Sequence, residues 1–97
     1  MTAARRKYYS TLKQGVMKQT MFLAYLTDVW HTHESRDLIG VCSNINSSVN
    51  ICHQRAIKDN HQIDFEQDEL LRRIHQTQGY SEQYEFYIEE HPIDNLI

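Results

Sequence analysis

The residues with the greatest chemical potential in this chain are its six histidines and two cysteines. Asp28 lies three positions before His31, a spacing that places both side chains on one face of a helix, where they could ligate a metal ion. A structural zinc site needs four ligands, and Cys42, Cys52 and His53 lack the short paired spacing of zinc modules. The Glu-x-x-His pairs of a di-iron bundle are also missing from the sequence. We therefore expect no metal ion and no other cofactor.

Thiol catalysis is weakly supported as well. Cys52 is followed directly by His53, but neighbouring side chains on a helix point about 100° apart, whereas a nucleophile needs its base within hydrogen-bond reach. The sequence contains no glycine-rich phosphate loop, nucleophile elbow or paired-carboxylate motif. The prediction is that the protein is not an enzyme and that both cysteines are buried structural thiols. The alternative to this prediction is an enzyme that depends on a metal ion or on a reactive thiol.

A basic and aromatic cluster near the N-terminus is the first candidate for binding a ligand or partner. Such a mixture can contact phosphate groups and stack on bases. The sequence pI of about 6.0 is far from the strongly basic values typical of nucleic-acid-binding modules. We therefore expect a protein partner first, and a nucleotide, another small molecule or a nucleic acid as the alternative. The residues of this cluster are Arg5, Arg6, Lys7, Tyr8 and Tyr9.

The C-terminal part of the chain offers a second candidate surface. Residues 80–97 hold five acidic residues and no Lys or Arg, whereas residues 1–27 hold five Lys and Arg and no acid. This split favours attraction between the two ends, within or between subunits, and contact of one end with a charged partner is the alternative. The predicted acidic partner face consists of Glu82, Glu85, Glu89 and Glu90.

A long first helix is expected to carry the basic cluster at its start. From residue 3 to residue 33, apolar side chains recur at a heptad spacing that is typical of a helix. Ten of the fifteen residues from Val16 to Trp30 are apolar, so this helix would be apolar almost all round and would need cover on every side. It could be the central helix of a small bundle or the interface of a homo-oligomer. The predicted oligomer interface is Met17, Met21 and Tyr25.

The segment from residue 36 to residue 58 has an apolar period of three and four residues and is expected to form a second helix, with Ser35 as its N-cap. Its Asn and Ser residues are poor helix formers. A β-hairpin with strands at 38–42 and 49–53 is therefore an open alternative.

Two further helices are expected after a loop at residues 59–63. The third starts at Asp64, where Gln67 completes a possible capping box, and ends at Gly79. The fourth is short, starts at Ser81, continues to Glu90 and stops before Pro92.

Together these features predict one domain over residues 1–97, all-α, built as a small bundle of about four helices and oligomeric. Ninety-seven residues support only a small core. The longest apolar run is far shorter than a membrane span, and the N-terminus lacks the apolar region of a signal peptide. We expect a cytoplasmic, non-enzymatic interaction or regulatory protein, such as an inhibitor or adaptor, that self-associates and binds another macromolecule.

Overall fold

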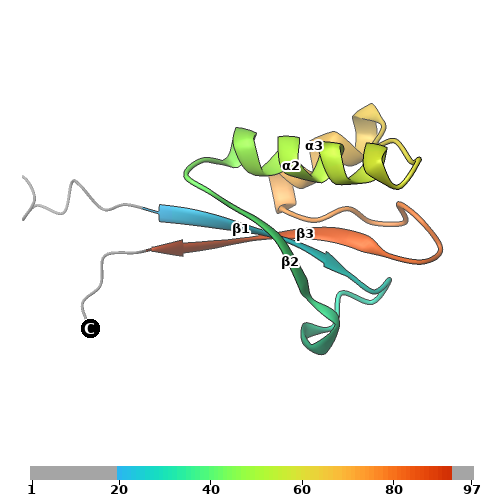
Figure 1. Ribbon diagram of the computed structural model, residues 1–97, viewed down its shortest axis with the longest axis horizontal. Helices are drawn as coiled ribbons and strands as arrows, with labels where there is room; N and C mark the ends of the chain where they lie inside the picture. Colours follow the sequence, from blue (N-terminus) through green and yellow to red (C-terminus); the bar gives the residue numbers. More distant parts are fainter. Residues whose placement is uncertain (1–19, 93–97) are drawn as a thin grey trace, which may run out of the picture.

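The computed structural model describes residues 20–92, which form a three-stranded antiparallel sheet with two α-helices on one of its faces (Figure 1). The strand order is β2-β1-β3, so the first strand lies in the centre. This is an α+β fold, and the predicted all-α bundle of four helices is therefore wrong. The elements are β1 (Thr20–Thr27), the 3₁₀ turn η1 (His33–Ser35), β2 (Asp37–Cys42), α2 (Ile45–Lys58), α3 (Phe65–Ile74) and β3 (Glu85–Pro92).

Strand β1 replaces what was predicted to be the second half of a long first helix. Its alternate residues Phe22, Ala24 and Leu26 belong to the core beneath the helices. The residues between them point to the other face, because successive side chains in a strand alternate. A segment that is apolar on all sides suits a buried helix and a strand covered on both faces equally well. Pairing with β3 along the whole of β1, from Thr20–Pro92 to Thr27–Glu85, stabilises the strand.

The segment predicted as a second helix divides into a strand and a helix. The alternative β-hairpin is not found either, because only its first strand, β2, is present. The Asn44 side-chain oxygen accepts a hydrogen bond from the Ser47 backbone N–H at 2.8 Å and so caps α2. Gly40 allows β2 to approach this helix closely, since a Cβ atom there would lie 2.5 Å from Cδ1 of Ile51.

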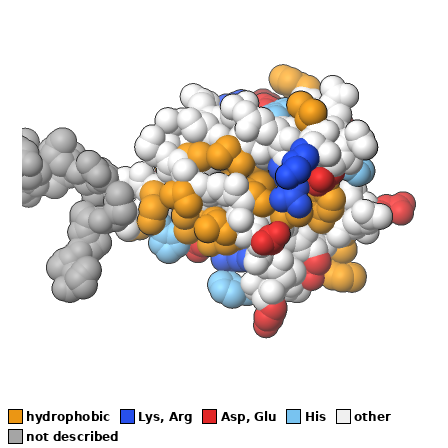
Figure 2. Space-filling model, in the orientation of Figure 1, with side chains coloured by type: hydrophobic (Ala, Val, Ile, Leu, Met, Phe, Trp, Pro, Cys, Tyr) orange, Lys and Arg blue, Asp and Glu red, His pale blue; other side chains and the backbone are white. Residues whose placement is uncertain are grey.

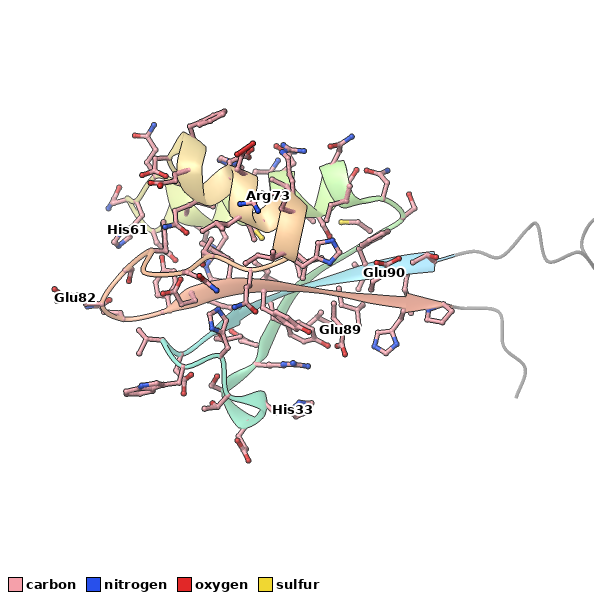
Figure 3. The ribbon with its side chains drawn as sticks, turned by 180° about the vertical axis from the view of Figure 1, so that it is seen from behind. His33, His61, Arg73, Glu82, Glu89 and Glu90 are labelled. Carbon is pink, nitrogen blue, oxygen red and sulfur yellow. The ribbon has the colours of Figure 1, made fainter. Side chains whose placement is uncertain are left out.

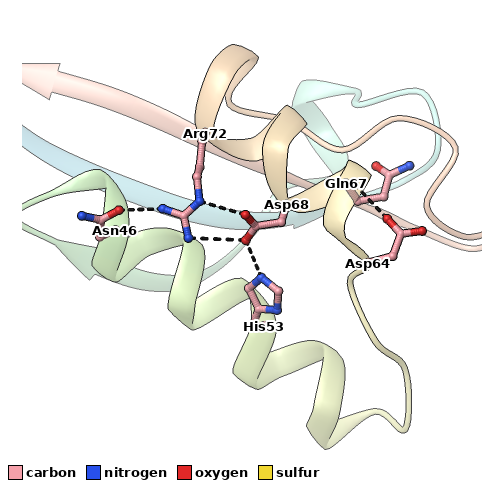
Figure 4. Close-up of polar contacts among 6 residues, drawn as sticks. All are labelled: Asn46, His53, Asp64, Gln67, Asp68 and Arg72. Atoms are coloured by element: carbon pink, nitrogen blue, oxygen red, sulfur yellow. Dashed lines mark hydrogen bonds and ion pairs between the residues drawn. The ribbon is translucent and has the colours of Figure 1, made fainter.

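The predicted start of the third helix is confirmed. The Asp64 carboxylate accepts a hydrogen bond from the Gln67 backbone N–H at 2.9 Å and caps α3 (Figure 4). The helix ends earlier than predicted, at His75, whose left-handed backbone (φ 62°) terminates it four residues before Gly79. The Gln67 side chain does not complete a capping box but donates a hydrogen bond to the Gln78 carbonyl at 2.8 Å.

The predicted fourth helix is wrong, because residues 85–92 form strand β3. The Ser81 hydroxyl does accept backbone hydrogen bonds, from Gln83 at 2.9 Å and Tyr84 at 3.2 Å, but it stabilises a turn and not a helix start. Beyond the turn, Phe86 and Ile88 alternate into the core and are almost fully buried. Aromatic and β-branched residues at this spacing favour a strand.

The core lies between the sheet and the two helices. Small residues on α2, Cys52 and Ala56, are fully buried and let the helix lie close to β1. No helix in residues 20–92 combines the length and apolar character that a membrane crossing requires. The buried apolar residues are Ala24, Val49, Cys52, Ala56, Ile63, Leu71, Phe86 and Ile88.

Candidate interaction surfaces

The face of the sheet opposite the helices is apolar at its centre, and we call it the open face. Both α-helices of the described chain lie on the other side (Figure 1). Leu23 stands opposite Val41 of β2, and Tyr25 stands opposite Leu38 of β2 and Tyr87 of β3. Val41 is 56 % exposed and Leu38 is 52 % exposed, and both extend the apolar surface of β1 across β2. The apolar residues of the open face are Met21, Leu23, Tyr25, Leu38, Val41 and Tyr87, and Glu89 and His91 of β3 lie on the same side of the sheet.

An arginine lies over the aromatic part of the open face. The Arg36 guanidinium carbon is 4.5 Å from the ring centroid of Tyr87 and 5.3 Å from that of Tyr25, and the two rings stack at 6.3 Å. Arg36 also forms an ion pair with Glu89 at 3.4 Å. Burial, and next the Glu89 charge, raise the pKa of Tyr25. The charges above the open face thus neutralise each other.

Two of the three residues predicted as an oligomer interface, Met21 and Tyr25, lie together on the open face. A spacing of four residues puts side chains on the same side of a strand, as it does on a helix. Met17 lies outside the described residues. The interface itself stays a prediction, although the structure places both described residues on one surface.

A groove of about 330 Å³ separates the outer side of β2 from α2, and we call it the β2–α2 groove. Contact between Gly40 and Ile51 brings strand and helix together at one end. Figure 2 shows this side of the molecule, with hydrophobic side chains gathered along β2 and beneath α2 and Lys and Arg side chains beside them. The groove is lined by Asp37, Leu38, Ile39, Ile51, Gln54, Arg55 and Lys58.

The two outer edges of the sheet differ. Residues 75–77 cover the middle of β3, because the Thr77 N–H donates to the Phe86 carbonyl at 3.0 Å and the Ile88 N–H donates to the His75 carbonyl at 2.8 Å. By contrast, no strand within residues 20–92 pairs with the outer edge of β2. Unpaired edge strands present backbone donors and acceptors that can accept a further strand.

The predicted acidic partner face is not brought together. Glu82 lies at the far end of the loop that precedes β3, away from Glu89 and Glu90 (Figure 3). Glu89 and Glu90 are neighbours in β3 and so point to opposite faces of the sheet. Glu85 is 2 % exposed and its carboxylate accepts hydrogen bonds from the Thr77 hydroxyl at 2.6 Å and the Gly79 N–H at 2.8 Å. It therefore anchors the loop from inside the protein.

The basic cluster of residues 5–9 lies outside the described residues. Its charge can still be compared with that of the folded part. Residues 20–92 hold twelve Asp and Glu against five Lys and Arg, a formal net charge of −7, whereas residues 1–19 hold five Lys and Arg and no acid. An acidic body of this kind repels phosphate backbones.

The histidine nearest to a carboxylate links the two helices. His53 Nε2 lies 2.7 Å from Asp68 Oδ1, and Arg72 donates from Nε to Asp68 Oδ2 at 2.9 Å and from Nη1 to Asn46 Oδ1 at 2.6 Å (Figure 4). The hydrogen bond from Arg72 is the main cause that lowers the pKa of Asp68. With both sides of the carboxylate occupied, this network holds α2 against α3.

The remaining chemical candidates have structural surroundings. Asp28 precedes a turn and not the end of a helix, and its carboxylate accepts the backbone N–H groups of Trp30 and Thr32, both at 3.0 Å. The Thr32 backbone hydrogen bond is the main cause that lowers the pKa of Asp28. Burial raises the pKa of the Cys52 thiol to about 12, so this thiol is not a nucleophile near neutral pH. Within the described residues, no three His, Cys, Asp or Glu side chains are grouped to hold a metal ion.

No protein-family model, curated protein or solved structure matches this chain. The sequence did not predict the β2–α2 groove, the place of Lys58 in its lining or the exposure of Val41 on the open face. The signal that could have indicated an edge strand is the short apolar run Leu38–Cys42, which a glycine interrupts.

Proposed function

We propose that this protein is a non-enzymatic interaction protein that self-associates by packing the open faces of two copies against each other. The observation that carries the proposal is that β1 is apolar on both faces while the described helices cover only one. An antiparallel sheet with one face in water normally alternates apolar and polar residues, but β1 places Met21, Leu23 and Tyr25 on the uncovered side. A strand of this composition suits a position in which both of its faces are covered by other layers of protein.

A second copy is a suitable cover for this face. Arg36 and Glu89 already neutralise each other above the sheet, so two open faces can meet without burying an unpaired charge. Two sheets can stack face to face about 10 Å apart, with their side chains between them. Three strands about 4.8 Å apart and some 20–26 Å long give a face of roughly 300–400 Å². Counted over both copies, this is roughly 600–800 Å², which is below the roughly 1,200 Å² of standard specific interfaces, so we expect weak and reversible association.

Light scattering coupled to size exclusion tests this proposal. We expect the mass of the wild-type protein to rise above 11.6 kDa as the concentration increases through the micromolar range. Val41→Lys places a like charge on both faces of the pair, and we expect it to shift the protein to the monomer. Because Val41 is 56 % exposed, this substitution leaves the core in place.

Phe65→Lys is the matched control, since Phe65 is a 78 % exposed apolar residue on α3, away from the open face. It should associate as the wild type does. A wild-type mass of 11.6 kDa at every concentration would overturn the proposal, and so would a Val41→Lys variant that associates like the wild type. A cytoplasmic location is part of the same proposal. Both cysteines are free thiols, as is usual in a reducing compartment.

A further inference from the structure

The outer edge of β2 and the groove beside it form a second surface, separate from the centre of the open face. The strand contributes backbone groups that no described residue pairs. The groove contributes side-chain contacts, with Ile39 and Ile51 on its apolar floor. An extended peptide that adds to an exposed sheet edge obtains affinity from main-chain hydrogen bonds and specificity from pockets for alternate side chains. The edge of β2 offers the main-chain groups, and the groove beside it offers the side-chain pocket.

The shape of the β2–α2 groove follows from a single close contact. Strand and helix touch at Gly40 and Ile51, where even a methyl group would lie 2.5 Å from the isoleucine. The lining residues come from the beginning of β2 and from the last two turns of α2, so the groove lies towards the C-terminal end of the helix. A guest strand placed along β2 would direct alternate side chains into this space.

The groove holds a larger share of cations than the domain around it. Two of the five Lys and Arg residues in 20–92, Arg55 and Lys58, line the groove against one acid, Asp37, whereas the domain carries a net charge of −7. Arg55 pairs with Asp59 at 3.0 Å. Lys58 is exposed and forms no ion pair with a described residue. The guest side chain that fits beside Lys58 is therefore a carboxylate.

We infer that the β2–α2 groove binds an extended acidic segment of a partner protein by strand addition to β2. The guest contributes a β-branched or other apolar side chain to the floor formed by Ile39 and Ile51. An Asp or Glu at a neighbouring groove-facing position reaches Lys58 and the rim. This inference does not depend on self-association, because Lys58 and the groove floor are not part of the open face.

The test uses the full chain and an array of synthetic peptides in which Val alternates with fully varied positions. We expect the binders to be enriched in Asp and Glu. Lys58→Glu should weaken the acidic binders roughly three- to tenfold, since an exposed charge pair contributes modestly and reversal turns attraction into repulsion. The same variant should gain affinity for the corresponding peptides that carry Lys.

Arg73→Glu is the matched control, because Arg73 is an exposed cation at the end of α3 that does not line the groove. It should leave peptide binding unchanged. Amide chemical shifts of residues 37–42 and 54–58 should move on addition of a binder, in the wild type and in Val41→Lys alike. The inference is overturned if no peptide binds, if the binders show no preference for acids, if Lys58→Glu binds like Arg73→Glu, or if the shifts occur elsewhere.

Discussion

Glu85 should contribute more to stability than any exposed acid of this chain. Its carboxylate is 2 % exposed and accepts hydrogen bonds from the Thr77 hydroxyl at 2.6 Å, the Gly79 N–H at 2.8 Å and the Tyr80 N–H at 3.2 Å. Glu85→Gln keeps the size of the side chain but turns one acceptor oxygen into an amide donor that faces another donor. A hydrogen bond to a charged group contributes about 1.5–3 kcal/mol, and a buried donor left without a partner costs about 1–3 kcal/mol.

Because both effects concern the same oxygen and overlap in part, we expect Glu85→Gln to lower the free energy of unfolding by about 2–4 kcal/mol. Urea denaturation followed by circular dichroism measures this difference, provided that the slope of the unfolding free energy against urea concentration is the same in both proteins. Glu82→Gln is the control, since Glu82 is exposed in the same loop, and we expect an effect within about 0.5 kcal/mol. If the two substitutions have equal effects, Glu85 does not anchor the loop, and our account of this segment is wrong.

Three further predictions concern the packing of α2. Because the pKa of folded Asp68 is lowered, its contribution to stability is present above the unfolded pKa and is lost as the pH falls through the folded pKa. The difference in urea midpoint between wild type and Asp68→Asn should therefore be largest near neutral pH and shrink in acid. Burial raises the pKa of Cys52 to about 12, so a thiol reagent should modify Cys52 only after unfolding, and rapid modification in the native protein would contradict its burial. Gly40→Ala should cost about 1–3 kcal/mol by overpacking against Ile51 Cδ1, as measured by urea denaturation, and adding Ile51→Val, which removes that atom, should restore part of the loss.

Local hydrogen-bonding signals in the sequence were more informative than the apolar period. Asp64 caps a helix as predicted, because a carboxylate three residues before an N–H needs only its own neighbours. Ser81 also accepts the expected backbone N–H groups, but the chain then extends into β3. A cap fixes one turn, whereas the element that follows depends on what it packs against. The Asp64 cap could therefore be predicted, and the strand after Ser81 could not.

The candidate surfaces illustrate the same limit. The apolar excess around Met21 and Tyr25 was visible in the sequence, and the structure places both residues on one uncovered face. The spacing of four residues could not distinguish a helix from a strand, since it keeps two side chains on one side in either case. Lys58 and Ile39 are nineteen positions apart, and only the crossing of β2 under α2 brings them to one groove. Such a juxtaposition depends on tertiary structure and leaves no local pattern.

The central position of β1 has a consequence for how the protein is made. Its partner β3 lies about sixty residues later, and the core contribution of Phe86 and Ile88 arrives with that strand. On the ribosome, residues 20–74 emerge first and can form at most a two-stranded hairpin with two helices, whose apolar underside is incomplete. Closure of the sheet has to wait until residue 92 has left the exit tunnel, and pairing over such a separation is intrinsically slow. During this interval the edge of β1 that β3 will cover is unpaired, and this apolar strand is then most exposed to aggregation and to chaperones.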